Sequence, residues 1–344
     1  MGAANPRTAS RKGGAWSAWH EGAAPIRLGV STCLLGEAVR WDGGHKRDTF
    51  LVEELGRWVE WVSVCPEVEL GMGIPRPTVR LVDDGERGDE RTDELRMLSP
   101  KTGEDFTERM VAYSEQRVAE LRELELDGYV LKKDSPSCGM QRVKVWGLGG
   151  PKRKDGVGLY ARALLAAWPH LPIEEEGRLC DPILRENFVE RIFCRNRWRA
   201  LERGGRTRGR LVEFWTAHKL LVRAHDEVGY QRLGKLVGSA KKGSADALYA
   251  EFEGAFFDAL SKRATTRKHV NVLQHAMGYL REALDPGERA QLTEAIEDYR
   301  RGLLPLVVPI TLVRFQIKKH AIEYLLGQLY FDPHPKELML RNRV

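Results

Sequence analysis

The segment 26–33, IRLGVSTC, decides the fold of the first half of the chain. Its apolar residues form a short run that suits a buried strand, which ends at Thr32 and Cys33. Further strands are predicted at 61–64, 79–82 and 129–131, and helices at 49–58, 106–125 and 159–168. Strands that alternate with helices are typical of an α/β domain, so we predict a Rossmann-like, mainly parallel sheet.

Three of the five cysteines follow predicted strands. Cys33 ends the first strand, Cys65 ends the second, and Cys138 lies in the loop after 129–131. The loops beyond the carboxyl ends of parallel strands line one edge of a sheet, where ligands bind. We therefore expect these three side chains to lie close together.

The spacing of these cysteines does not by itself identify a metal site. Most free cysteines are small buried hydrophobic residues, and no CxxC pair is present among these three. However, Cys65 precedes Pro66 and Cys138 follows Ser-Pro-Ser, so both lie in turns. Three thiolates at one edge could hold a zinc ion, hold a cubane iron–sulfur cluster with one open iron, or act as a nucleophile with resolving thiols. We interpret Cys180 and Cys194 as structural.

The composition predicts a cytoplasmic protein of two domains. The chain has 344 residues, 42% hydrophobic and 30% charged, with a net charge of +6 and a pI near 9.0. This charge moderately favours an anionic partner. An odd number of scattered cysteines argues against a secreted disulfide framework, and no segment suits a signal peptide or a membrane span. We predict no membrane partner, and a disordered leader at 1–24.

After residue 178 the predicted elements change from alternating strands and helices to helices alone. We predict a basic helix and linker at 179–208, with the helix at 184–201, and an all-α domain at 209–344. Helices are expected at 211–225, 230–237, 245–260, 266–284, 288–301 and 311–329. Arginines interleaved with aromatic residues suit phosphate neutralisation and base stacking. The predicted RNA-binding residues are Arg195, Arg197, Arg199, Lys268, His269, Lys318 and Lys319.

The segments around the three cysteines resemble the thiouracil desulfidase family, of the TudS type. The resemblance is carried by 29–36 (GVSTCLLG) with 39–46 (VRWDGGHK), by 64–68 (VCPEV) with 71–77 (GMGIPRP), and by 134–139 (DSPSCG). Residues 209–335 resemble the YbgA-like helical domain that is often fused to this one, through 218–219 (HK), 268–275 (KHVNVLQH) and 333–335 (PHP). The combination is similar to enzymes that act on thiolated uridine in tRNA.

The resemblance implies a 4Fe-4S cluster held by Cys33, Cys65 and Cys138, with one iron open to the substrate's sulfur. It also implies that Glu67 is an acid/base carboxylate and Ser135 a proton-relaying hydroxyl. The residues alone favour a solvated loop charge at Glu67 and a turn-capping hydroxyl at Ser135.

A glycine-containing loop follows the first strand. Its amides, with Asp42, His45 and Lys46, could cradle a phosphate or a base edge, or form a tight turn with solvated charges. We take Asp42, His45 and Lys46, together with Ser31, as the candidate substrate-binding residues.

The sequence therefore predicts an iron–sulfur desulfidase domain at 25–178. It would remove sulfur from thiolated uracil or uridine, either 4-thiouridine or 2-thiouridine in tRNA, and give uridine and sulfide. A small thiolated base would be the minimal substrate, and the C-terminal domain would bind thiolated tRNA. The alternatives are a non-catalytic RNA-binding or redox-sensing iron–sulfur protein, and a zinc hydrolase that uses the same three thiolates.

Overall fold

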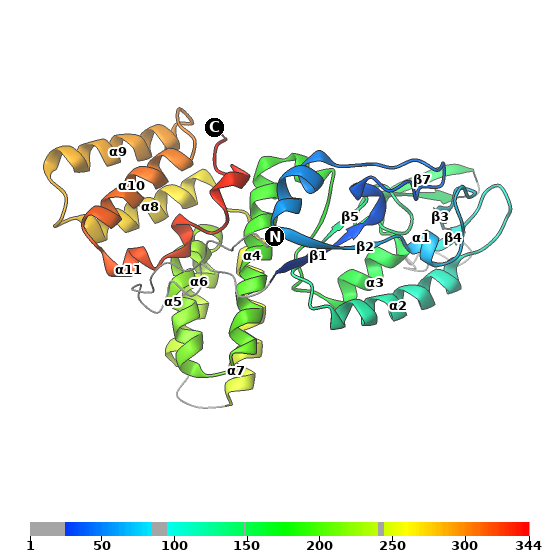
Figure 1. The fold of residues 1–344 in the computed structure, drawn as a ribbon, viewed down its shortest axis with the longest axis horizontal. Coiled ribbons are helices and arrows are strands. Elements are labelled where there is room, and N and C mark those ends of the chain that lie inside the picture. The colour runs from blue at the N-terminus through cyan, green and yellow to red at the C-terminus, as the bar shows by residue number, and fades with distance from the viewer. Residues whose placement is uncertain (1–24, 84–94, 148, 240–243, 344) are drawn as a thin grey trace, which may run out of the picture. The chain divides into compact units, whose positions relative to one another are not determined.

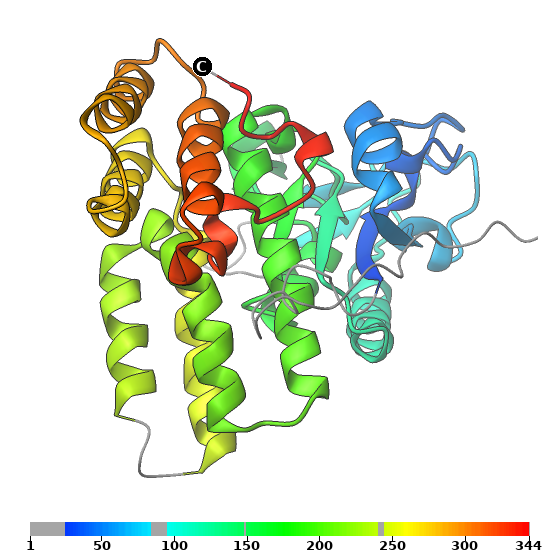
Figure 2. The ribbon, with the colours of Figure 1, turned by 60° about the vertical axis from the view of Figure 1, so that its left-hand side comes forward.

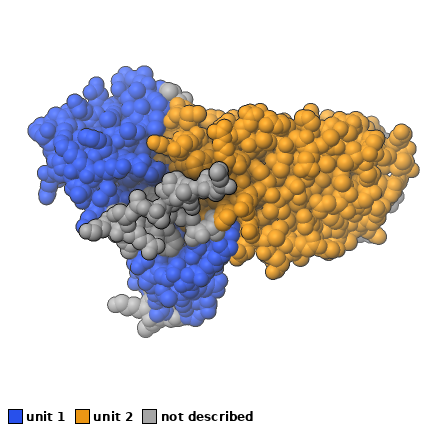
Figure 3. All heavy atoms as spheres, viewed as in Figure 1, with its two compact units in different colours: residues 1–23, 199–333, 344 blue, residues 24–198, 334–343 orange. Residues whose placement is uncertain are grey.

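The computed structural model describes residues 25–83, 95–147, 149–239 and 244–343, so the predicted leader at 1–24 lies outside the described residues. The chain forms two compact units (Figure 3). Residues 24–198 together with 334–343 make up the N-terminal unit, and residues 199–333 make up the helical unit.

A four-stranded sheet forms the centre of the N-terminal unit (Figure 1). Its strands are β1 (Ile26–Ser31), β2 (Val59–Val64), β5 (Gly128–Leu131) and β8 (Ile173–Glu175), in the order β2-β1-β5-β8 and all parallel. The predicted α/β fold with a mainly parallel sheet is confirmed. Gly29 has a packing role here, because a Cβ at this position would lie 2.1 Å from the ring of Tyr129.

A second sheet was not predicted. It contains β3 (Arg80–Val82), β4 (Arg96–Leu98), β6 (Val143–Gly147) and β7 (Gly150–Gly156), in the order β4-β3-β6-β7. Only the β3–β6 pairing is parallel. Strand β7 reads GPKRKDG and is mostly exposed, so it lacks the apolar alternation by which strands are recognised.

Helices cover both faces of the first sheet. On one face α2 (Thr107–Glu123) and α3 (Leu159–Ala167) share a core with Tyr129 and Leu131. On the other, α4 (Pro182–Arg203) shares a core with β1. The helix predicted at 49–58 is instead a π-helical turn, η3 (Phe50–Glu54), followed by a 3₁₀ turn, η4 (Leu55–Arg57). Shorter turns are α1 (Pro66–Glu69), η2 (Thr32–Leu35) and η5 (Arg178–Cys180).

The predicted domain boundaries need correction at both ends of the helical region. Helix α4 belongs to the N-terminal unit as far as Trp198, and residues 334–343 return to that unit. Leu338 and Leu340 join the same apolar core as Leu28 on β1. The return segment is also tied to α4 by Arg341, whose Nε and NH2 donate to Glu186 Oε1 (3.0 Å) and Glu190 Oε1 (2.7 Å). Residues 334–343 are therefore part of the N-terminal unit, not of the helical domain.

As predicted, the regular secondary structure of the helical unit is all helical in its described residues. The helices are α5 (Arg208–His225), α6 (Glu227–Gly238), α7 (Ala245–Ser261), α8 (Thr266–Leu280), α9 (Pro286–Arg300), α10 (Val307–Lys319) and α11 (Glu323–Leu326), followed by η6 (Leu329–Phe331). A further turn, η7 (Lys336–Leu338), lies in the return segment. Figure 2 shows α8, α9 and α10 packed together.

Local signals fix several of these helix ends. The side chains of Thr207, Ser244, Thr265 and Asp285 each accept a backbone N–H at the start of a helix, which satisfies donors that the helix itself leaves unpaired. The helix predicted at 311–329 breaks after Lys319, where Ala321 adopts a left-handed conformation with φ 49°. No helix among the described residues is both long and apolar enough to cross a membrane.

Candidate active site

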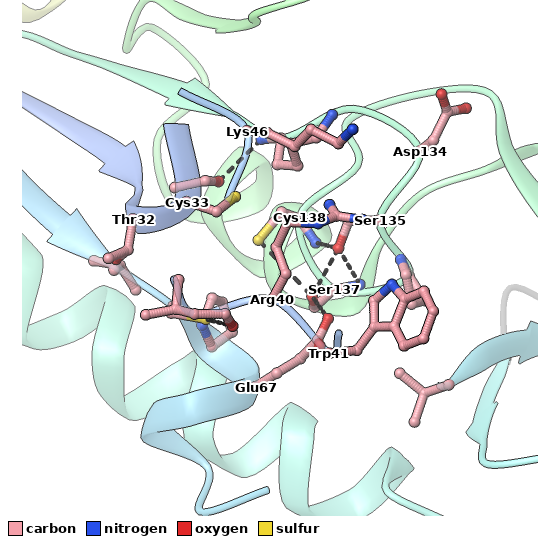
Figure 4. A pocket seen from close by; sticks show the side chains of 18 of the residues that line it. Thr32, Cys33, Arg40, Trp41, Lys46, Glu67, Asp134, Ser135, Ser137 and Cys138 are labelled. Atoms are coloured by element: carbon pink, nitrogen blue, oxygen red, sulfur yellow. Dashed lines mark hydrogen bonds between the residues drawn. The ribbon is translucent and has the colours of Figure 1, made fainter. Parts of the chain in front are cut away.

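A cavity of about 430 Å³ opens at the carboxyl ends of β1, β2 and β5. Cys33, Cys65 and Cys138 all line it, so the structure brings together three cysteines that lie far apart in sequence. Figure 4 shows the sulfur atoms of Cys33 and Cys138 turned toward the same space, with Glu67 nearby. A cavity of this size suits a ligand as small as a nucleobase.

Each cysteine is positioned by its local backbone. Cys33 lies in η2, and its carbonyl accepts the N–H of Lys46 (2.8 Å). Cys65 precedes α1, and its N–H donates to Glu69 Oε1 (3.1 Å). The N–H of Cys138 donates to Ser135 Oγ (3.1 Å). These contacts fix the backbone from which each sulfur atom projects.

The three thiols have little exposure to solvent. Cys33 and Cys138 are buried, Cys65 is half-buried, and none forms a disulfide. Burial raises the pKa of Cys33 to about 11, and it also raises the pKa values of Cys65 and Cys138. Because a thiolate rather than a thiol binds a metal, these cysteines need a metal's positive charge to lose their protons near neutral pH.

The ligand atoms of the three cysteines are spread more widely than those of the most compact group of ligand atoms in the described residues. Among the described residues, another group, Glu186, Glu190 and His334, has ligand atoms that all lie within 4.8 Å of one another. The cysteines form no such group, so their sulfurs span a larger distance. Bonds of about 2.3 Å around a zinc ion would hold two sulfurs only about 3.8 Å apart.

Glu67 has its carboxylate fixed on both sides. Arg76 donates to Glu67 Oε2 from Nε (2.8 Å), and its NH2 lies 2.7 Å from the same oxygen. Ser137 Oγ donates to Glu67 Oε1 (2.7 Å). The Arg76 side chain is only 3% exposed and also donates to the carbonyls of Val39 (2.9 Å) and Gly73 (3.1 Å). Glu67 is therefore a held, charge-paired carboxylate at the cavity, not a solvated loop charge.

Ser137 contacts Glu67, whereas Ser135 does not contact it directly. Ser135 Oγ accepts the backbone N–H groups of Ser137 (3.3 Å) and Cys138 (3.1 Å), as a turn-capping hydroxyl does. It lies 2.9 Å from Ser137 Oγ, so Ser135, Ser137 and Glu67 form a continuous chain of hydrogen-bonding groups. Sequence reasoning missed Ser137 and Arg76, although both stand inside the quoted motifs.

The predicted substrate-binding residues separate into two pairs. Ser31 and Lys46 line the cavity, whereas Asp42 and His45 are not among its lining residues and are exposed. Asp42 Oδ1 accepts the N–H of Gly44 (3.0 Å), which lowers the pKa of Asp42, and His45 Nδ1 accepts the N–H of Arg47 (3.2 Å). In this structure the side chains of Asp42 and His45 close the turn, and their role in substrate binding stays a prediction.

Comparison with known proteins identifies both parts of the chain. Residues 28–176 match the family model described as 2-thiouracil desulfurase, and residues 219–335 match one described as a protein of unknown function (DUF1722). The uncharacterised protein YbgA of Escherichia coli K12 is 34% identical over 158 residues, which are 46% of this chain and 94% of that protein. The chain therefore belongs with the YbgA-like proteins, and its residues 28–176 form a domain that matches the 2-thiouracil desulfurase family.

Two other proteins are each similar to less than half of this chain. The uncharacterised protein YbbK of Bacillus subtilis 168 is 28% identical over 147 residues, covering 43% of this chain and 95% of that protein. A solved structure titled [4Fe-4S]-dependent thiouracil desulfidase TudS is 26% identical, covers 45% of this chain and 94% of its own, and has a TM-score of 0.35.

The last residue of β8, Glu175, and the residue after it, Glu176, hold the loop that carries Cys138. Glu175 Oε1 accepts the N–H of Met140 (2.7 Å), and Glu176 accepts the N–H of Lys133 (2.8 Å) and pairs with the Lys132 ammonium. Burial raises the pKa of Glu175. These contacts anchor both ends of the loop that carries Cys138, and nothing in the sequence pattern of β8 revealed them.

The structure corrects several of the predicted RNA-binding residues. The side chains of Arg197, Arg199 and His269 are 5%, 6% and 2% exposed, so they offer almost no surface to RNA. His269 Nδ1 lies 3.1 Å from the hydroxyl of Tyr330, which explains its place in the core of the YbgA-like domain.

The remaining predicted residues differ in how much of the side chain is available. Lys268 Nζ donates to the carbonyl of Arg263 (3.0 Å), and Lys319 pairs with Glu288 (2.5 Å). Arg195 is half-buried, and Lys318 is exposed. Among the seven predicted RNA-binding residues, Lys318 is therefore the one that is exposed and forms no ion pair in the described part of the chain.

Proposed function

We propose that this chain is an iron–sulfur-dependent desulfidase that removes sulfur from thiolated uracil or uridine, as 4-thiouridine or 2-thiouridine in tRNA, and gives uridine and sulfide. One observation carries the proposal. A carboxylate fixed by Arg76 and Ser137 opens onto the same cavity as three converging cysteines. The match of residues 28–176 to the 2-thiouracil desulfurase family model supports the thiolated pyrimidine as substrate.

The cysteine set suits a 4Fe-4S cluster better than a zinc ion. Cys33, Cys65 and Cys138 would supply three thiolate ligands, and their spread beyond 4.8 Å favours several iron atoms over one ion. The fourth iron would have no protein ligand. Such an open iron supplies a Lewis acid with high affinity for sulfur. The spacing argues against the zinc hydrolase for the same reason.

The side chains of the cavity provide the acid–base chemistry that desulfuration needs. Replacing sulfur with oxygen consumes one water: the water's oxygen bonds to the ring carbon, and its protons end on the departing sulfide and on the solvent. Glu67 is placed to orient that water and accept its proton, because Arg76 prevents the carboxylate from turning away. Ser137 and Ser135 offer a route for a proton through hydroxyl groups 2.9 Å apart.

Positive charge at the cavity suits an anionic or electron-rich substrate. Lys46, Lys132 and Lys133 line it together with Arg40, and Trp41 stands at its edge with 45% of its surface exposed. The helical unit would hold the tRNA. Because the proposed substrate is tRNA, we expect the protein in the cytoplasm.

Cluster loading and turnover can be tested separately. Protein reconstituted anaerobically with iron and sulfide should bind about four irons per chain. Cys65→Ser should lose iron. Glu67→Gln should keep the iron but release no sulfide from 4-thiouracil. Glu54→Gln is the matched control, because Glu54 is an exposed glutamate on η3.

Two results would contradict the proposal. A colourless protein with stoichiometric zinc would support the zinc hydrolase. A cluster-loaded wild type that binds thiolated tRNA but releases no sulfide would support the non-catalytic RNA-binding or redox-sensing protein.

A further inference from the structure

Helices α5 and α6 of the helical unit pack side by side (Figure 1). A groove runs between them. Its volume is about 380 Å³. Helix α5 contributes Thr216 and Lys219, and α6 contributes Tyr230, Gly234 and Lys235. Trp215 and Tyr230, whose ring centroids lie 5.6 Å apart, also line it. We call this feature the α5–α6 groove.

The charge of the groove is positive and uncompensated. Lys219 and Lys235 line it, and none of the lining residues is an aspartate or glutamate. In the part of the chain that the structure describes, neither ammonium group forms an ion pair. A neighbouring hollow differs in this respect, because Glu213 and Glu323 line it. Of the two hollows, the α5–α6 groove is the one suited to phosphate groups.

Gly234 leaves the α6 wall of the groove without a side chain. It lies inside α6, where glycine costs about 1 kcal/mol relative to alanine. A Cβ built on Gly234 meets no atom within 4 Å, and the residue has no positive φ, so neither packing nor backbone conformation requires glycine. Glycine at such a position lets a ligand approach the helix backbone.

We propose that the α5–α6 groove binds the sugar–phosphate backbone of the RNA substrate. This inference rests on the proposed function. Lys219 and Lys235 would contact phosphates, and Gly234 would let the RNA backbone lie against α6. The groove then takes the role that the sequence assigned to Arg197, Arg199 and His269, which are buried.

The charge contribution is tested by the salt dependence of binding. The probe is an unmodified tRNA transcript, so that neither thiolation nor turnover affects the result. Each lost phosphate contact lowers the slope of log affinity against log salt by about one, so Lys219→Ala with Lys235→Ala should lower it by about two. Lys101→Ala, at an exposed lysine of the N-terminal unit, should leave the slope unchanged.

The close-approach role of Gly234 is tested by a variant that should fold better but bind worse. Gly234→Ala should raise the melting temperature of the helical unit, because alanine is the better helix former. It should nevertheless weaken tRNA binding. Gly278→Ala is the matched control: Gly278 lies in α8, and a Cβ there also meets nothing within 4 Å. It should stabilise the helix without changing the affinity.

The outcomes separate this inference from the proposed function. If wild type binds the transcript and the Lys219, Lys235 and Gly234 variants bind it equally well at every salt concentration, the groove is not the RNA surface and the inference is overturned. A partner protein would then be the occupant to seek. If wild type does not bind tRNA at all, the RNA part of the proposed function is overturned as well. Sulfide release from free 4-thiouracil should be the same in all variants.

Discussion

Replacing Arg76 with methionine should both destabilise the N-terminal unit and stop catalysis. The change removes a guanidinium that is 3% exposed and that contacts Glu67 Oε2 and two backbone carbonyls. Methionine fills similar space but donates no hydrogen bond. Glu67 would then be left as a poorly solvated carboxylate that keeps the hydrogen bond from Ser137.

The expected cost follows from the burial of the pair. Removing one partner of a buried ion pair costs about 3–5 kcal/mol. Glu67 is 13% exposed and keeps the hydrogen bond from Ser137, so we expect a loss at the lower end, about 3 kcal/mol. This is a large part of the 5–15 kcal/mol that typically stabilises a protein, so urea should unfold the variant at a clearly lower concentration.

A double-mutant cycle isolates the pair. Glu67→Gln and Arg76→Met each leave one charge unpaired, whereas the double variant leaves none. Its destabilisation should therefore be smaller than the sum of the two single losses by about 2 kcal/mol. Unfolding is followed by circular dichroism and by fluorescence. An Arg76→Met protein that unfolds at the wild-type urea concentration would refute this reasoning.

Three further perturbations test other parts of the account. Ser137→Ala should lower kcat for sulfide release more than Ser135→Ala, because of the two serines only Ser137 contacts the Glu67 carboxylate; the reverse order would show that Ser135 is the main relay. Deleting residues 334–343 should lower iron retention and the melting temperature of the N-terminal unit, since Leu338 and Leu340 leave its core; an unchanged melt would contradict this. Burial lowers the pKa of His334 to about 4, below its ordinary 6.5. Between these two values the folded state binds fewer protons than the unfolded state. The free energy of unfolding of wild type should therefore fall by about 3 kcal/mol as the pH falls from 6.5 to 4. His334→Gln should not show this loss in urea unfolding at the two pH values.

The sequence was most informative where the signal is local. The apolar run of β1 and the turn residues around Cys65 and Cys138 were enough to predict a parallel sheet with cysteines at one edge. Such features depend on the strand itself and on its immediate neighbours.

The sequence was least informative where distant segments meet. The arginines of α4 suggested an exposed basic face, but Arg197 and Arg199 are buried. Glu186 on the same helix pairs with Arg341, which lies 155 residues further along the chain. Arg76 is a single arginine in a loop, and only the folded structure reveals that it holds Glu67. Periodicity within a helix cannot identify partners at such separations.

Mass-spectrometric nucleoside analysis of tRNA tests the central claim most directly. Thiolated tRNA is incubated anaerobically with cluster-loaded protein, digested and analysed, with Glu67→Gln protein as the control. We expect that 4-thiouridine or 2-thiouridine disappears, that uridine appears in equal amount, and that wild type alone releases sulfide. Thiolated nucleosides that persist unchanged in the presence of a fully loaded cluster would contradict this expectation.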